Sequence, residues 1–246
     1  MKAIIVGSGN VAEGLAREIA EGSSGIELVQ RWARKSHTPA ELAKADLYII
    51  AVSDNAVAEV SEQLPFAEGS VVAHTAGSVA MSDLSTKIAH RAVLYPLQSF
   101  TRGRRVADFR RTPFFVEGAT THALETVRTV AEALSDSVTE MSSERRAHLH
   151  LAGTFANNFT NAMLSLAETI AREAGETFDT LKPLIAETTA KALSMPSPRE
   201  AQTGPAKRGD RNTQARHLAT LAEHHPELTE IYEKISETIW KISKRN

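Results

Sequence analysis

The chain contains no cysteine among its 246 residues. Disulfide bonds, thiolate zinc sites and a cysteine nucleophile are therefore all excluded. There is no surplus of basic residues either, because 28 Lys and Arg stand against 30 Asp and Glu and give a formal net charge of -2. Binding to a phosphate backbone needs such a surplus, so nucleic acid is not an expected partner.

Long apolar runs are also missing, and none approaches the roughly 20 residues that a membrane-spanning helix requires. The opening residues MKAIIVG are typical of a strand rather than of the charged start of a signal peptide. We therefore expect a soluble, cytoplasmic protein without a membrane partner. With 42% hydrophobic and 24% charged residues, the chain can bury a sizeable core, and its length favours two domains.

The first part of the chain alternates between strand-like and helix-like segments, as α/β folds do. Continuous apolar runs such as residues 47–52 indicate strands of a parallel sheet with helices on both faces. The expected strands are 3–6, 26–32, 47–52, 70–74, 91–95, 113–116 and 137–141, with a helix near 122–134. The sequence thus predicts a Rossmann-type, mainly parallel sheet over residues 1–141.

From Ser142 onward the pattern is helical, and residues 142–246 are predicted to form a separate all-helical domain. Its first helix, from Ser143 to about Ala174, would be roughly 45 Å long at 1.5 Å per residue. Residues 196–209 are expected to form one long irregular loop. The last segment repeats apolar residues at helical spacing on one face, namely Leu228, Ile231, Tyr232, Ile235, Ile239 and Ile242. We expect the helical domain to form a homodimer.

The strongest local signal is the turn after the first strand, Gly7-Ser8-Gly9-Asn10-Val11-Ala12. Gly7 would allow the tight turn, Gly9 would let backbone N–H groups approach a pyrophosphate, and Ala12 would let the helix pack closely on the sheet. The helix N-terminus adds partial positive charge. The pattern predicts a dinucleotide site, with Val52, Ser53 and Gly77 as further cofactor contacts. The alternative is that the glycines only make a tight turn.

The end of the second strand predicts which dinucleotide binds. A carboxylate there favours NAD, whereas cations favour NADP, and this chain has Arg34, Lys35 and Ser36 with no Asp or Glu. A charge-assisted hydrogen bond from Arg34 to a 2′-phosphate is worth about 1.5 to 3 kcal/mol. We therefore predict NADP(H). The alternative is a solvated basic loop.

Two polar residues follow later strands at the carboxyl edge of the sheet, where ligands of open α/β folds bind. His74, with an ordinary imidazole pKa of about 6.5, could donate a proton or a hydrogen bond to a substrate carbonyl. Alternatively, it holds the following turn through a backbone hydrogen bond. Gln98 ends the next strand and is a second catalytic candidate.

The long helix carries a polar stripe within an otherwise apolar sequence. An unpaired buried polar group costs about 1 to 3 kcal/mol, so the stripe must face water, a ligand or polar partners. Its members are His150, Thr154, Asn157, Asn158 and Asn161. We predict that it faces a substrate cleft between the domains, with Asn158 as a catalytic residue and with His150 and Asn157 as substrate-binding residues. The alternative is a structural network at a helix or subunit interface.

The segment 202–210 leads into a helix that carries His217, a further catalytic candidate, and Asp210 is the expected N-cap. Arg208 in this segment would bind an acidic group of the substrate, although caps and turns alone would also explain these residues. No metal site is expected, because His148 and His150 point to different helix faces and His224 and His225 are adjacent.

Together these segments resemble a family of uncharacterised NADP oxidoreductases that join a Rossmann-like domain to a C-terminal all-helical domain of unknown function. The resemblance covers nearly the whole chain and rests on GSGNVA, HTAGS, YPLQSF, HLAGTFANNFTN and TGPAKRGD. More distantly, the chain is similar to pyrroline-5-carboxylate reductase, deazaflavin-dependent NADP reductase and the β-hydroxyacid dehydrogenases. The resemblance implies helices that dimerise and an active site between the domains.

One departure limits what this resemblance implies. The β-hydroxyacid dehydrogenases and ketopantoate reductases have a catalytic Lys four residues before an Asn, but here Thr154 precedes Asn158 at that spacing. The leading hypothesis is an NADP(H)-dependent oxidoreductase acting on a small carbonyl, imine or hydroxy compound. A regulatory or scaffold protein that binds NADP without turnover is the second hypothesis, and a fold that has lost its nucleotide is the third.

Overall fold

The computed structural model describes residues 1–22 and 25–244. They form two compact units, which divide between Ala162 and Met163. This division lies within helix α5 (Thr160–Glu173), whereas the domain boundary expected after residue 141 marks the change of sequence pattern and stays a prediction. The last two residues of the expected helical domain, 245 and 246, lie outside the described residues.

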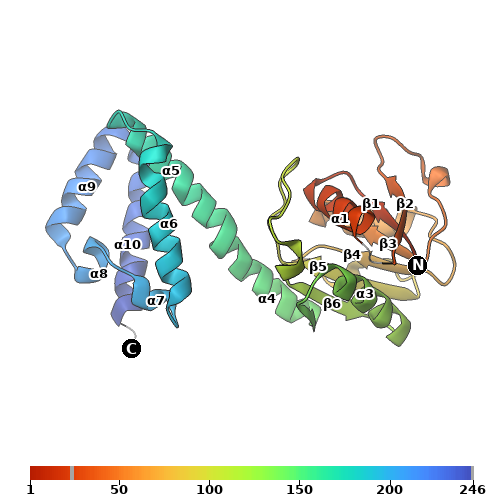
Figure 1. Cartoon of the computed structure of the whole chain (residues 1–246). Helices are drawn as coiled ribbons and strands as arrows, with labels where there is room; N and C mark the ends of the chain where they lie inside the picture. Colours follow the sequence, from red (N-terminus) through yellow and green to blue (C-terminus); the bar gives the residue numbers. More distant parts are fainter. Residues whose placement is uncertain (23–24, 245–246) are drawn as a thin grey trace. The chain divides into compact units, whose positions relative to one another are not determined.

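The first unit is built on a seven-stranded sheet with the order β2-β1-β3-β4-β5-β6-β7 (Figure 1). Neighbouring strands are parallel except β5 and β6, which are antiparallel. The strands are β1 (Lys2–Val6), β2 (Glu27–Trp32), β3 (Leu47–Ile50), β4 (Val71–His74), β5 (His90–Pro96), β6 (Phe114–Gly118) and β7 (Val138–Glu140). The predicted α/β class with a mainly parallel sheet is confirmed.

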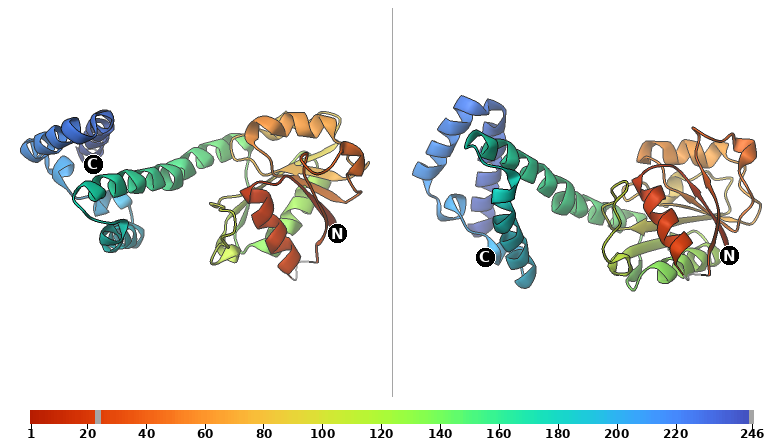
Figure 2. Two further views of the ribbon diagram at one scale, coloured as in Figure 1. Left: turned by 90° about the horizontal axis from the view of Figure 1, so that it is seen from above. Right: turned by 45° about the horizontal axis from the view of Figure 1, so that its top comes forward.

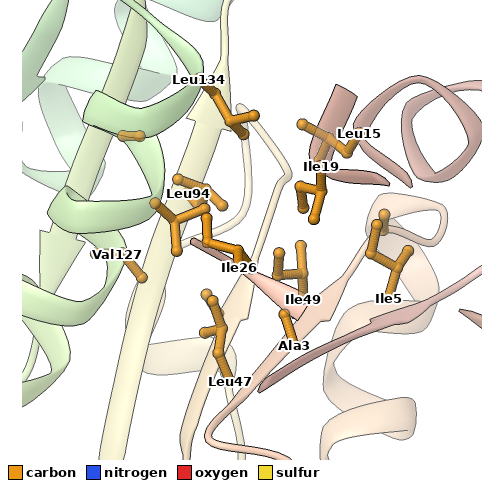
Figure 3. Packing of buried hydrophobic residues seen from close by; sticks show 14 of the residues in the cluster. Ala3, Ile5, Leu15, Ile19, Ile26, Leu47, Ile49, Leu94, Val127 and Leu134 are labelled. Carbon is orange, nitrogen blue, oxygen red and sulfur yellow. The ribbon is translucent and has the colours of Figure 1, made fainter. Parts of the chain in front are cut away.

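Helices cover both faces of this sheet (Figure 2). Helices α1 (Asn10–Glu21) and α3 (Thr121–Leu134) pack on one face, where Ile5 and Ile49 meet Leu15 and Val127 (Figure 3). Helix α2 (Val57–Gln63) packs on the other face. The single-turn 3₁₀ helices are η1 (Pro39–Glu41), η2 (Asp54–Ala56), η3 (Met81–Asp83) and η4 (Phe109–Arg111). Alternate strand residues are buried on opposite faces because side chains of a strand point alternately up and down.

The predicted long helix is present but not uniform. It begins with α4 (Ser143–Gly153) and continues through a π-helical segment, η5 (Thr154–Phe159), into α5. π-Helical turns inside α-helices often occur at functional sites. The sequence pattern predicted the extent of the helix, but not the change of hydrogen-bond spacing within it.

The second unit is helical. It contains α6 (Phe178–Ser194), α7 (Pro198–Ala201), α8 (Pro205–Arg208), α9 (Arg211–His224), η6 (Pro226–Leu228) and α10 (Thr229–Lys244). The expectation of one irregular loop over residues 196–209 is wrong, because α7 and α8 each form a turn of helix there. Both start at a proline, whose fixed φ suits the first helical position. In residues 1–22 and 25–244 no helix has the length and apolar character needed to span a membrane.

Candidate functional site

A cavity of about 710 Å³ lies at the carboxyl ends of strands β1 and β3. Nine of the eleven predicted cofactor residues line it: Gly7, Ser8, Gly9, Asn10, Val11, Arg34, Lys35, Val52 and Ser53. The other two, Ser36 and Gly77, are not part of its lining. Ser36 instead donates its hydroxyl to the carbonyl of Ala33. The structure therefore brings most of the predicted cofactor residues into one place.

The shape of the glycine turn fits a dinucleotide. Gly7 has φ +143°, and a Cβ on it would lie 2.1 Å from the carbonyl oxygen of Ala51, so this position accepts only glycine. A Cβ on Gly9 would meet no protein atom within 4 Å, which leaves the backbone open on the cavity side. Within residues 1–22 and 25–244, no side chain caps the N-terminus of α1. Its first N–H groups and its dipole are thus available to an anion such as a pyrophosphate.

At the end of β2 the cavity is lined by Trp32, Ala33, Arg34 and Lys35. The guanidinium of Arg34 lies 3.2 Å from a carboxylate oxygen of Glu59 in an exposed ion pair. Exposed pairs of this kind contribute about 0 to 1 kcal/mol. The pair therefore costs little to exchange for a phosphate bound in the cavity.

The segment after β5 passes over the glycine turn. The side-chain amide of Asn10 donates to the carbonyl of Phe100 at 3.1 Å, and Arg102 donates to the carbonyl of Ser8 at 3.2 Å. The ring of Phe100 lies directly against Gly14 of α1. These contacts bring Gln98 and Phe100 into the wall of the dinucleotide cavity.

His74 is placed differently from what a catalytic acid requires. Its side chain is fully buried and is not part of the lining of the dinucleotide cavity. Nδ1 accepts the backbone N–H of Ala76 at 3.2 Å, which is the turn-holding contact of the alternative interpretation. Burial, helped by the positive charge of Arg146, lowers the pKa of His74 to about 4. The imidazole is therefore neutral at pH 7, and the catalytic role of His74 stays a prediction.

A second hollow, of about 260 Å³, adjoins the dinucleotide cavity, and Gln98 lines both. Three predicted site residues of the long helix, His150, Asn157 and Asn158, also line this hollow. Four residues that the sequence separates by up to 60 positions thus surround one space. We call it the Gln98 hollow.

The Gln98 hollow has one functional candidate that sequence reasoning missed. Tyr95, at the end of β5, lines it and places its hydroxyl 3.0 Å from Nδ1 of His150. Burial raises the pKa of the Tyr95 phenol. Tyr95 opens the same YPLQSF segment that contains Gln98, but a strand residue that alternates with apolar neighbours gives no signal of its own chemistry.

The imidazole of His150 packs against the backbone of Gly77. A Cβ on Gly77 would lie 2.3 Å from Nδ1 of His150, so the imidazole packs directly on the backbone there. Gly77 has no positive φ, and glycine is therefore needed at this position for space rather than for backbone conformation. The structure places Gly77 beside His150, and its predicted nicotinamide contact stays a prediction.

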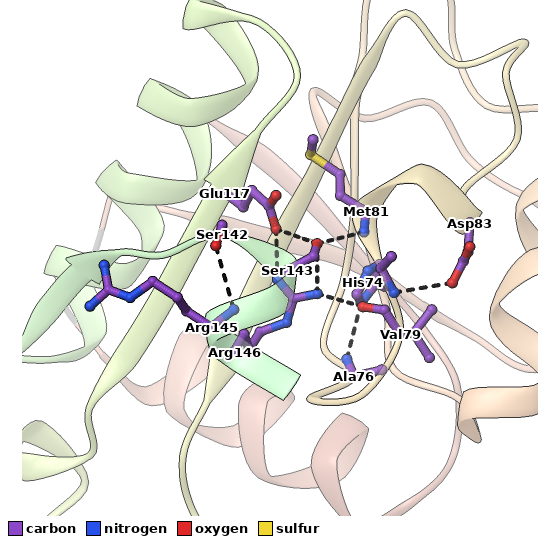
Figure 4. A network of polar contacts seen from close by, with 11 residues as sticks. His74, Ala76, Val79, Met81, Asp83, Glu117, Ser142, Ser143, Arg145 and Arg146 are labelled. Atoms are coloured by element: carbon purple, nitrogen blue, oxygen red, sulfur yellow. Dashed lines mark hydrogen bonds and ion pairs between the residues drawn. The ribbon is translucent and has the colours of Figure 1, made fainter. Parts of the chain in front are cut away.

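The start of α4 is fastened to the sheet by a buried polar network (Figure 4). The side chain of Arg146 is 1% exposed and donates to Glu117 of β6 and to the carbonyl of Val79. Ser143 joins the network through a hydrogen bond of 2.6 Å to Glu117. Arg146 and His150 are four residues apart and lie on the same helix face, so this network also sets the position of His150.

Two predicted site residues belong to the second unit. Nδ1 of His217 lies 2.8 Å from the hydroxyl of Tyr232, and both residues line an apolar groove of that unit. Arg208 is exposed at the end of α8, near the N-cap Asp210. Asp210 accepts the backbone N–H of Thr213 at 3.0 Å, so the predicted cap is confirmed. The roles of His217 and Arg208 toward a substrate stay predictions.

Comparisons with known proteins agree with this architecture. A family model described as a domain of unknown function (DUF2520) matches residues 112–239. The putative NADP oxidoreductase BF3122 from Bacteroides fragilis is 33% identical, with 98% of each chain covered and a TM-score of 0.89. Protein TM1727 from Thermotoga maritima is 20% identical, with 98% of each chain covered and a TM-score of 0.72.

More distant structures share the fold. Pyrroline carboxylate reductase from Plasmodium falciparum, solved with NADP bound, is 11% identical, covers 99% of this chain and 100% of its own, and has a TM-score of 0.58. No curated protein matches the chain. The predicted resemblance is confirmed, and these neighbours support a nicotinamide dinucleotide as the cofactor class. The family match and the full-length likeness to the Bacteroides protein show that the chain belongs to the DUF2520 family.

Proposed function

We propose that the protein is an NADP(H)-dependent oxidoreductase that acts on a small carbonyl, imine or hydroxy compound. The observation that carries this proposal is the shared wall at Gln98, which joins the dinucleotide cavity to a second hollow that contains several polar side chains. Such an arrangement would allow a bound dinucleotide and a bound substrate to come into contact. When bound, the nicotinamide ring supplies the hydride chemistry.

The chain's own residues bind and orient both molecules. The N–H groups of the glycine turn and of the α1 N-terminus hold the pyrophosphate. Gln98, Asn157 and Asn158 carry amide groups that line the Gln98 hollow, where they donate to and accept from the polar atoms of the substrate. The hollow thus selects a small polar molecule and holds its reacting atom toward Gln98.

NADP(H) rather than NAD(H) is the proposed form of the cofactor. Arg34 and Lys35 both line the cavity at the end of β2, and among the described residues no carboxylate stands in its lining. A 2′-phosphate would replace the weak exposed contact of Arg34 with Glu59 by a charge-assisted hydrogen bond.

An acidic substrate fits the surroundings of the Gln98 hollow. A further hollow of about 350 Å³ shares Gln98, Ser99 and Asn157 with it, and Arg104 and Arg105 stand in its lining. Arg105 is paired with Glu18 and Glu21. Arg104 is therefore the cation that we assign to a carboxylate of the substrate.

A homodimer through the helical unit is also proposed. Among the described residues of this unit the buried hydrophobic side chains are those of Ala206, Leu221 and Leu228. Large apolar side chains such as Leu184 and Leu193 are 66% and 82% exposed. The burial of so few side chains cannot offset the conformational entropy that is lost when these helices become ordered. A second copy of the chain would cover the exposed apolar surface. A monomeric mass at micromolar concentration would contradict this assembly.

Isothermal calorimetry with NADPH and NADH, followed by a screen of NADPH oxidation, tests the function. We expect NADPH to bind more tightly than NADH, and at least one small oxo acid or cyclic imino acid to be reduced. Binding without turnover of any such compound would favour the second candidate, a regulatory NADP-binding protein. The observation behind that candidate is Thr154, which occupies the position of a family-type lysine and donates its hydroxyl to the carbonyl of His150.

A further inference from the structure

We propose that Tyr95 is the proton donor to the substrate and that His150 returns the proton to Tyr95. This inference rests on the proposed function, because it places the reacting carbonyl or imine in the Gln98 hollow. It deepens that function by naming the acid, which neither the family match nor the structural neighbours assign.

The geometry of the pair carries the proposal. The hydroxyl of Tyr95 and Nδ1 of His150 are 3.0 Å apart, and both side chains line the Gln98 hollow. The two rings meet edge to face, with centroids 5.9 Å apart. Tyr95 is buried whereas His150 is only partly buried. Tyr95 can therefore give a proton to a substrate in the hollow, and His150 can take up a proton from solvent.

Three features fix the pair in this arrangement. The imidazole of His150 packs directly against the backbone of Gly77. The buried ion pair of Arg146 with Glu117 holds the helix one turn before His150. The ring of Tyr95 packs near that of Phe115 on the neighbouring strand, with centroids 6.3 Å apart. Positioned donors of this kind contribute to catalysis because their orientation is set before the substrate arrives.

Burial favours the protonated phenol of Tyr95 before reaction. Burial raises its pKa, the positive charge of Arg146 opposes this rise, and the negative charge of Asp54 adds to it. Tyr95 therefore keeps its proton at neutral pH and can give it away only to a stronger base. The oxygen or nitrogen of a substrate that has just received a hydride is such a base.

A hydride from the reduced dinucleotide forms the new C–H bond, and the π electrons of the C=O or C=N bond move to the oxygen or nitrogen. That atom takes the proton of the Tyr95 hydroxyl and becomes an alcohol or amine. As Nε2 of His150 takes a proton from solvent hydronium, Nδ1 gives its proton to the phenolate, so the imidazole stays neutral and the net proton consumed comes from solvent. Exchange of the ring protons with water then restores the Nδ1–H tautomer. His74, fully buried and outside the lining of the hollow, takes no part.

The first test needs no substrate. Nitrogen-15 NMR of the histidine rings, with His150 assigned through His150→Gln, is recorded for the wild-type protein and for Tyr95→Phe. We expect the His150 nitrogens to shift when the hydroxyl is lost, while the packed ring remains. Tyr232→Phe is the matched control, because it removes the corresponding hydroxyl from the Tyr232–His217 pair of the helical unit. It should leave the His150 signals unmoved.

The second test measures turnover with pyruvate, glyoxylate and Δ1-pyrroline-5-carboxylate as probes. For any probe reduced by NADPH, Tyr95→Phe should lower kcat by roughly 100-fold or more while the Kd of NADPH stays within threefold. His150→Gln should lower kcat less and change the pH profile, because water must then reprotonate Tyr95 directly.

The outcomes separate the proposal from the function on which it rests. Unmoved His150 nitrogens in Tyr95→Phe overturn the pair, whether or not a probe is reduced. A Tyr95→Phe enzyme with wild-type kcat also overturns it but leaves the oxidoreductase function standing. Failure of the wild-type protein to bind NADPH in calorimetry overturns the function itself.

Discussion

The guanidinium of Arg146 lies 2.7 Å from a carboxylate oxygen of Glu117 and joins helix α4 to strand β6. The Arg146 side chain is nearly inaccessible to solvent. A charge in such a place is tolerated only when it is paired and hydrogen-bonded. The pair thus connects the stability of the first unit with the position of the residues that follow on the helix.

Replacement of Arg146 should therefore be costly. Arg146→Met leaves Glu117 without its charged partner, although Ser143 still donates to it, and breaking a buried pair typically costs about 3 to 5 kcal/mol. Because Glu117 is partly exposed, we expect the lower end of this range in urea unfolding. Arg145→Met is the control, because Arg145 immediately precedes Arg146 in the same helix and its side chain is exposed. Equal unfolding midpoints for the two variants would show that the buried pair does not stabilise the fold.

Replacement of Gly7 and replacement of Gly9 should have different effects on the protein. Gly7→Ala puts a methyl group against the Ala51 carbonyl at a strained φ, so it should lower the melting temperature. Gly9→Ala meets no protein atom but fills space proposed for the pyrophosphate. It should leave the melting temperature unchanged and weaken NADPH binding at least tenfold in calorimetry. Unweakened binding in Gly9→Ala would remove the pyrophosphate from this turn.

Arg34→Ala tests the choice of nucleotide. Loss of a charge-assisted hydrogen bond should weaken NADPH binding by roughly 10- to 100-fold and leave NADH binding nearly unchanged. Glu59→Gln removes the competing carboxylate and should preserve or improve NADPH binding. Equal losses for both nucleotides in Arg34→Ala would argue against a 2′-phosphate contact.

His74 should make stability depend on pH. Its pKa is about 4 in the folded protein, against about 6.5 in an unfolded chain. The unfolded state alone takes up the proton between these values, so the free energy of unfolding falls as the pH drops from 6.5 to 4. The loss reaches roughly 3 kcal/mol at pH 4.

Urea unfolding at several pH values measures this dependence. His74→Asn should flatten it, whereas His148→Asn, which removes an exposed imidazole, should not. If both variants keep the wild-type slope, His74 is not the group that titrates.

The fold could be predicted well from the sequence because its signals are local. Apolar runs such as residues 47–52 and the turn at Gly7 fix strands and helices without knowledge of the rest of the chain. The direction of β6 is not local. The connection from β5, residues 97–113, has no helix that crosses back over the sheet, and an antiparallel neighbour needs none.

The candidate site was only half predictable. Most predicted cofactor residues line one cavity, because they belong to the glycine turn or follow the carboxyl ends of neighbouring strands. The pairing of Tyr95 with His150 joins residues 55 positions apart, and no periodicity encodes it. His74 occupies the expected sheet edge, but its burial, which no local pattern encodes, lowers its pKa.

The π-helical segment Thr154–Phe159 has a further consequence. In an α-helix successive side chains diverge by about 100°, so the amides of two adjacent residues rarely line the same cavity wall. A wider turn narrows that divergence, and Asn157 and Asn158 both reach the Gln98 hollow. The arrangement of these amides is therefore governed by the number of residues in one turn, and a single deletion that restores α-helical spacing there would turn one of the two amides away from the hollow.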